Sequence, residues 1–167
     1  RSTTGELTHA CGHPIAALIT TDENEQSMAS NIGIIGAGRM TKALSTKWLD
    51  AGHGVCVAGR TPDKARQLAD ELGRGCRSGS FREAVEFGDV LLIAVRHEGV
   101  METLEQAGAG EHALAGKVLI DCSNPVNIKD FTLAGNEHNS LAERIQQVSG
   151  ANVVKAFNLC EAQVWEM

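Results

Sequence analysis

The sequence predicts an α/β fold, a doubly wound parallel sheet of about six strands with helices on both faces. Short apolar segments alternate along the chain with segments whose apolar residues recur at helical spacing. The apolar segments hold few polar residues, as expected for strands buried on both faces. Glycine is frequent, at 18 of 167 residues, and aromatic residues make up only 4%, which favours tightly wound α/β structure over a β-sandwich.

Strands are expected at the apolar segments, the third of them being the weakest. They are residues Asn31–Gly36, Val55–Ala58, Gly73–Arg77, Asp89–Val95, Gly116–Asp121 and Asn152–Ala156. We expect the mononucleotide-binding strand order 3-2-1-4-5-6, which is typical of such sheets.

Helices are expected between these strands, where apolar residues recur every three to four positions. Thr61 suits the N-cap of the second helix and Pro62 suits its first turn. The segment Gly52–Gly54 ends the first helix. The expected helices are Arg39–Ala51, Pro62–Leu72, Phe81–Phe87, Gly99–Ala107, Leu141–Val148 and a last one that starts near Leu159.

Charge and composition exclude several classes of protein. Lysine plus arginine is 15 and aspartate plus glutamate is 21, so the net charge of −6 argues against a nucleic-acid-binding surface. No apolar run approaches the roughly 20 residues that span a membrane. The five cysteines are odd in number and widely spaced, without a CxxC pair, so they predict reduced thiols and a cytoplasmic protein instead of a disulfide framework or zinc ribbon.

The first thirty residues differ from the rest and are predicted to be an extension outside the core. Residues 1–30 are polar and mixed, whereas the strand–helix pattern begins at residue 31 and continues to 167. His9, Cys11 and His13 alternate within this extension, but no fourth ligand accompanies them, so we predict no metal site.

A glycine-rich turn follows the first strand and opens the first helix. It reads Gly36-Ala37-Gly38-Arg39-Met40-Thr41, which is G-x-G-x-x-T instead of G-x-G-x-x-G. The first glycine makes the tight turn, and the second lets a pyrophosphate approach the helix N-terminus. This context predicts dinucleotide binding, against the alternative of a simple glycine link between two elements. Thr41 departs from the small residue usual at the third position, so the helix is expected to stand slightly off the sheet.

The end of the second strand favours NADP over NAD. An NAD site places a carboxylate on the ribose at this point, whereas here Arg60 and Thr61 follow the strand. Lys64 falls in the first helical turn, where a cation is unfavourable unless an anion binds beside it. Arg60, Thr61 and Lys64 together fit a 2′-phosphate, while Asp63 favours the helix start.

Polar residues also follow the fourth and fifth strands. Ala94, Val95, Arg96 and His97 come after the fourth; His97 is either a proton donor or a residue at the start of the next helix. Asn124 and Pro125 come after the fifth, and the Asn124 amide either bonds a nicotinamide carboxamide or stabilises a turn. Cys122 is interpreted as a small buried residue and not as a nucleophile. No catalytic residue is predicted.

The segments NIGIIGAGRM, AGHGVCVAGRTPDKA, DVLLIAV, GKVLIDCSNPV and NVVKAFN together resemble the deazaflavin-dependent NADP reductase family, which is similar to the nucleotide-binding domain of six-transmembrane ferric reductases. The resemblance covers residues 31–158. It implies a Rossmann-type fold and hydride transfer between NADP(H) and a deazaflavin or flavin-like partner. It places Ala37, Gly38, Arg39 and Met40 at the pyrophosphate and ribose, Arg60, Thr61 and Lys64 at the 2′-phosphate, Ala94, Val95 and Arg96 at the nicotinamide ribose, Asn124 and Pro125 near the nicotinamide, and Ala156, Phe157 and Asn158 beside the second redox partner.

Members of that family continue past the VVKAFN strand with segments that help to enclose the second cofactor. The resemblance therefore predicts a chain whose nucleotide half is present and whose acceptor half is truncated. Two hypotheses follow: an NADP-dependent oxidoreductase with a small-molecule redox co-substrate, or an NADP-binding module without turnover. The sequence leaves open whether a homodimer completes the pocket.

Overall fold

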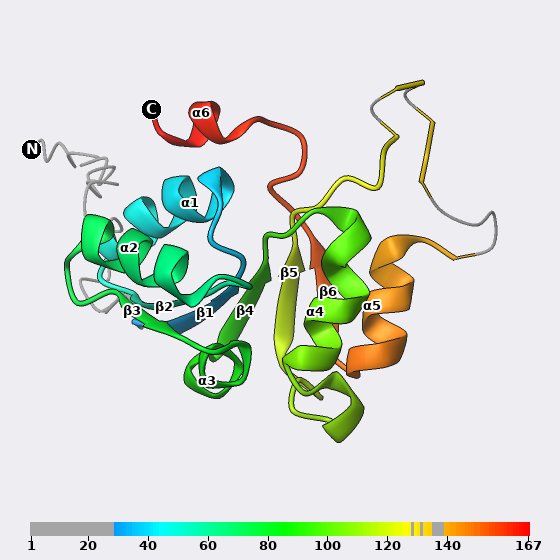
Figure 1. Cartoon of the computed structure of the whole chain (residues 1–167), viewed down its shortest axis with the longest axis horizontal. Coiled ribbons are helices and arrows are strands. Elements are labelled where there is room, and N and C mark those ends of the chain that lie inside the picture. Colours follow the sequence, from blue (N-terminus) through cyan, green and yellow to red (C-terminus); the bar gives the residue numbers. More distant parts are fainter. Residues whose placement is uncertain (1–28, 128, 131, 135–138) are drawn as a thin grey trace, which may run out of the picture.

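The fold is a Rossmann-like sheet of six parallel strands in the order β3-β2-β1-β4-β5-β6, which confirms the predicted fold class and strand order. The computed structural model describes residues 29–127, 129–130, 132–134 and 139–167 (Figure 1). The predicted boundary at residue 30 stays a prediction, because residues 1–28 lie outside the described part. The strands are β1 (Asn31–Ile35), β2 (Gly54–Ala58), β3 (Arg77–Gly79), β4 (Val90–Ile93), β5 (Val118–Asp121) and β6 (Asn152–Lys155).

Six α-helices connect or follow these strands in the described part of the chain. Helices α3 and α5 each begin with a reciprocal capping box, in which Ser80 pairs with Glu83 and Ser140 pairs with Glu143. A short 3₁₀ turn, η2 (His97–Gly99), leads into α4. The helices are α1 (Arg39–Asp50), α2 (Pro62–Leu72), α3 (Phe81–Phe87), α4 (Val100–Gln106), α5 (Leu141–Ser149) and α6 (Ala162–Trp165).

Two apolar cores lie on opposite faces of the sheet, because successive side chains of a strand point to opposite faces. Ile32 and Ile34 of β1 pack with Leu44 of α1 and Leu68 of α2 on one face. On the other face, the buried side chains of β4 and β5 pack with those of α3, α4 and α5. Figure 1 shows α1 and α2 on one side of the sheet and α3 on the other.

Helix α3 packs directly on the backbone of β1. A Cβ at Gly33 would collide with the Ala84 carbonyl of α3, so only glycine allows this approach. Ala84 is itself fully buried. Helix α3, which connects β3 to β4, therefore lies in direct contact with β1.

The structure corrects two of the predicted elements. Residues Gly73–Cys76 form a turn, closed by the Cys76 N–H donating to the Gly73 carbonyl at 2.8 Å, and β3 begins only at Arg77. The last helix begins at Ala162 instead of near Leu159. Other predicted ends differ by one or two residues, as at β4, which lacks Asp89, Ala94 and Val95.

No helix in the described part of the chain combines the length and apolar character needed to cross a membrane. The four cysteines in that part, Cys56, Cys76, Cys122 and Cys160, are free thiols.

The substitution Gly33→Ala is expected to lower the free energy of unfolding by about 1–3 kcal/mol, because the added methyl group forces α3 away from β1. Equilibrium urea denaturation measures the change. Gly99→Ala is the control: a Cβ there meets only Thr103 Oγ1, 4.0 Å away, and its φ of −94° suits alanine. Equal stability of the two variants would contradict the close packing of α3 on β1.

Candidate functional site

The turn between β1 and α1 brings three strands and one helix together. The Gly36 N–H donates to the Ala58 carbonyl at the end of β2, at 2.8 Å. Gly36 has a φ of +128°, and a Cβ there would collide with the Ala94 carbonyl beyond the end of β4. Glycine is therefore required at this position by both backbone conformation and space.

Thr41 fastens this turn to the first helix. Its side chain is fully buried, and its hydroxyl donates to the Gly36 carbonyl at 2.8 Å. The departure from the glycine fingerprint thus supplies a hydrogen bond that glycine or alanine cannot make. Such a bond stabilises a buried turn by about 1 kcal/mol.

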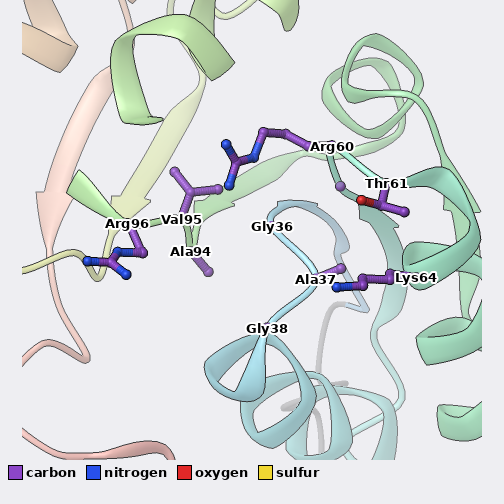
Figure 2. Close-up of a pocket in the computed structure, with 10 residues that line it drawn as sticks. Gly36, Ala37, Gly38, Arg60, Thr61, Lys64, Ala94, Val95 and Arg96 are labelled. Atoms are coloured by element: carbon purple, nitrogen blue, oxygen red, sulfur yellow. The ribbon is translucent and has the colours of Figure 1, made fainter. Parts of the chain in front are cut away.

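A hollow of about 230 Å³ opens beside this turn, at the carboxyl ends of the strands. It gathers predicted residues from the glycine turn, the end of β2 and the end of β4 (Figure 2). Its lining residues are Gly36, Ala37, Gly38, Gly59, Arg60, Thr61, Lys64, Ala94, Val95 and Arg96. Gly59 is the residue that sequence reasoning missed; its position directly before Arg60 was the available signal.

The charges around this hollow suit an anion. Three cations line it and no carboxylate does. Among the described residues, Arg60 and Lys64 form no ion pair, while Arg96 lies 3.3 Å from Glu98. Figure 2 shows the Lys64 ammonium directed toward the turn between Gly36 and Gly38.

The start of α1 adds to this positive potential. Gly38 is the N-cap, no side chain caps the helix, and the first turn carries no acidic residue. A Cβ added at Gly38 would meet no atom within 4 Å, so the helix N-terminus is open to the hollow. Exposed backbone N–H groups at a helix N-terminus bind phosphate readily.

The end of β2 offers polar groups in place of a carboxylate. Arg60 is exposed, and Thr61 is the N-cap of α2 without a hydrogen bond from its side chain to the helix. Pro62 occupies the first turn, as predicted. The Thr61 hydroxyl therefore remains available beside two cations.

A second hollow, of about 720 Å³, continues from the first along the ends of β4 and β5. Both hollows are lined by Ala94, Val95 and Arg96, so they lie next to each other at the end of β4. The second is lined by Met40, Ala94, Val95, Arg96, His97, Cys122, Ser123, Asn124, Val126 and Glu161. Sequence reasoning missed Ser123, Val126 and Glu161 as lining residues.

The remaining predicted site residues line neither of the two hollows. Arg39 lines a groove between α1 and α2. Pro125 and Ala156 are half-buried and follow β5 and β6, respectively. Asn158 pairs with Asn124: its carbonyl accepts from Asn124 Nδ2 at 2.7 Å, and its Nδ2 donates to Asn124 Oδ1 at 3.2 Å.

Phe157 packs into an aromatic cluster on α1. Its ring centroid lies 6.1 Å from that of Trp48 and 5.2 Å from that of Trp165, both in edge-to-face arrangement. Its φ of +61° turns the chain toward α6, which lies against α1 in Figure 1. The ring therefore supports the C-terminal segment and does not line either hollow.

Two side chains of the second hollow, His97 and Cys122, are candidates for proton transfer or nucleophilic chemistry by residue type. His97 Nδ1 lies 3.5 Å from Glu98 Oε2, at the start of η2. Burial raises the pKa of the Cys122 thiol to about 11, so the thiol is protonated at neutral pH. The described residues contain no cluster of potential metal ligands, and His9, Cys11 and His13 lie outside them.

Alkylation of Cys122 by iodoacetamide is expected to be slow at neutral pH and to rise about tenfold per pH unit between about pH 8 and about pH 10, because only the thiolate reacts. Mass spectrometry of the alkylated peptides measures the rate, with exposed Cys160 as the internal comparison. Rapid alkylation of Cys122 near pH 7 would contradict the raised pKa.

Comparison with known proteins adds a family assignment to this geometry. The family model described as "NADP oxidoreductase coenzyme F420-dependent" matches residues 31–125. The matched range runs from β1 through the residues after β5, so it contains the glycine turn and the lining of the first hollow.

Curated relatives include the metalloreductases STEAP3 of Rattus norvegicus and STEAP2 of Homo sapiens. The first is 32% identical over 136 residues, covering 80% of this chain and 25% of that protein. The second is 26% identical over 129 residues, covering 77% of this chain and 25% of that protein. The chain thus spans about a quarter of the length of these relatives.

Solved structures share the same architecture. A protein of Arthrobacter sp. FB24, provisionally described as an F420-dependent NADP-reductase, superimposes with a TM-score of 0.72 at 26% identity, covering 81% of this chain and 66% of that one. An imine reductase of Streptomyces aurantiacus superimposes with a TM-score of 0.57 at 24% identity, covering 75% of this chain and 40% of that one, a likeness of fold alone.

Proposed function

Because the chain belongs to the family of coenzyme F420-dependent NADP oxidoreductases, we propose that it binds NADP(H) in preference to NAD(H) and serves hydride transfer between the nicotinamide and a deazaflavin or flavin-like acceptor. The observation that carries this proposal is the cationic hollow beside the glycine turn. It has open backbone at Gly38, three cations and no carboxylate.

The first hollow fits the phosphates of the nucleotide. The N-terminus of α1 at Gly38 would hold the pyrophosphate, where helix N–H groups and the helix dipole favour negative charge. Arg60, Thr61 and Lys64 would hold the 2′-phosphate through charged and hydroxyl donors. A carboxylate at the end of β2 would repel that phosphate, and none lines the hollow.

The second hollow would hold the nicotinamide and the acceptor. The nicotinamide supplies a hydride when bound, and the task of the protein is to position it and to exclude water. Arg96 and Asn124 border this hollow, and Cys122 adds a neutral surface. The low thiolate fraction of Cys122 keeps a competing nucleophile away from the reactive ring. The cytoplasm, where NADPH and reduced thiols coexist, is the compartment we propose.

The alternative is an NADP-binding module without turnover. The first hollow would account for nucleotide binding by itself, whether or not hydride transfer follows. The adjacent second hollow favours turnover, because it offers room beyond the hollow proposed for the nucleotide phosphates. Nucleotide binding and acceptor reduction therefore need separate measurements.

Titration by ligand fluorescence is expected to show tighter binding of NADPH than of NADH. Arg60→Ala should weaken NADPH binding by about tenfold or more and NADH binding by less than about twofold, because a charged hydrogen bond to phosphate contributes about 1.5–3 kcal/mol. The preference should narrow as salt rises, since the side chain is exposed.

Arg66→Ala is the matched control for this titration. Arg66 is an exposed arginine of α2 that pairs with Asp63 at 3.6 Å and lines neither hollow. Equal affinity for the two nucleotides, or equal effects of the two arginine variants, would contradict a 2′-phosphate site at Arg60.

NADPH deuterated at C4 is expected to transfer its label to a deazaflavin acceptor without exchange into water, because the deazaflavin receives the hydride at a carbon atom. A flavin receives it at a nitrogen atom whose N–H exchanges with water, so for a flavin only the reduction itself is followed. Mass spectrometry of the reduced deazaflavin measures the label, and absorbance measures the reduction of a flavin or of a ferric chelate. Tight NADPH binding without reduction of any of these acceptors would contradict turnover and support the binding-module alternative.

A further inference from the structure

An ion pair with a buried carboxylate and a partly exposed lysine lies next to the second hollow. Asp121 ends β5 with a fully buried carboxylate, and Lys155 ends the neighbouring β6. Lys155 Nζ lies 2.8 Å from Asp121 Oδ2, and the lysine side chain is 34% exposed. Neither residue lines either hollow, so both act on the site only through their neighbours.

The pair holds the loop that follows β5 at Ser123. Asp121 Oδ1 accepts hydrogen bonds from the Ser123 N–H at 2.9 Å and from the Ser123 hydroxyl at 2.6 Å. Lys155 Nζ also donates to the Ser123 carbonyl. The backbone and side chain of one residue are thus bound by both members of the ion pair.

Ser123 is followed directly by Asn124, whose amide borders the second hollow. Asn124 is bound on its other side by Asn158, three residues after Lys155. The segments after β5 and β6 are therefore joined twice, once through Lys155 and once through Asn158. Among the residues that the structure describes, no partner takes the second N–H of the Asn124 amide or the second lone pair of its oxygen, so both can meet a ligand.

We propose that Asp121, Ser123 and Lys155 are positioning residues that fix Asn124, and so set affinity for the nicotinamide half of the nucleotide separately from affinity for the phosphate half. This inference rests on the proposed binding of NADP(H). A buried ion pair adds little stability compared with apolar residues of the same volume, so its value lies in the geometry it imposes. The Asp121–Lys155 pair lies beside the second hollow and away from the residues proposed to bind the phosphates. We therefore expect its effect at the nicotinamide end of the site.

Two ligands separate the halves of the site. NADPH reaches both hollows, whereas adenosine 2′,5′-bisphosphate carries the adenosine and its phosphates without a nicotinamide. Lys155→Met is expected to weaken NADPH binding by about fivefold to tenfold, the value of one or two misplaced hydrogen bonds. Binding of adenosine 2′,5′-bisphosphate should change by less than about twofold, since Arg60, Thr61 and Lys64 are untouched.

Matched variants distinguish positioning from loss of stability. Lys155→Arg keeps a cation beside Asp121 and should restore most of the NADPH affinity. Lys117→Met is the control, because Lys117 donates to the Gly88 carbonyl at 2.7 Å and precedes β5, at the amino-terminal end of the strands and away from both hollows. It should lower thermal stability without separating the two ligands. If Lys155→Met does not fold, Ser123→Ala replaces it in the comparison, because this variant removes one hydrogen bond to Asp121.

A double-mutant cycle tests the route through Asn124. Asn124→Ala should weaken binding of NADPH but not of adenosine 2′,5′-bisphosphate, as Lys155→Met does. The double variant should lose little more NADPH affinity than either single variant, because both changes remove the same contact of Asn124 with the nucleotide. Additive losses, or equal losses for both ligands, would overturn the positioning role while leaving NADP binding intact. Failure of the unmodified protein to bind either ligand would overturn the proposed function and this inference together.

Discussion

The close approach of the first turn to the end of β4 is the constraint on which the site depends. Gly36 lies against the Ala94 carbonyl, where a side chain has no room, and its own polar groups are bound by Ala58 and Thr41. The strand order reverses between β1 and β4, which opens a crevice at this point of the sheet. The turn keeps that crevice free of side chains on one side.

Charge then distinguishes this crevice from an ordinary sheet edge. The protein as a whole carries a net charge of −6, yet the lining of the first hollow is cationic. Arg60 and Lys64 lie beside an uncapped helix N-terminus, so full charges and backbone dipoles favour the same kind of ligand. A local positive site on an acidic protein selects a small anion and disfavours long polyanions.

Local signals made much of this structure predictable from sequence. A local sequence pattern marks the glycine turn, the start of α2 at Thr61 and Pro62, and each apolar strand. The predicted residues at the ends of β1, β2 and β4 line one hollow. The position of β3 could not be read this way, because its residues Arg77–Gly79 have no apolar pattern and their place is set by pairing with Cys56–Ala58. The Asp121–Lys155 pair joins residues distant in sequence, so only the sheet order brings them together.

Phe157 shows the same limit and leads to a practical result. Family resemblance places Phe157 in a segment beside a redox partner, and the structure shows that its ring packs between Trp48 of α1 and Trp165 of α6. These are the two tryptophans of a chain without tyrosine. All intrinsic tryptophan emission therefore originates where α1 meets the C-terminal segment, so the fluorescence of the unlabelled protein reports on that contact alone.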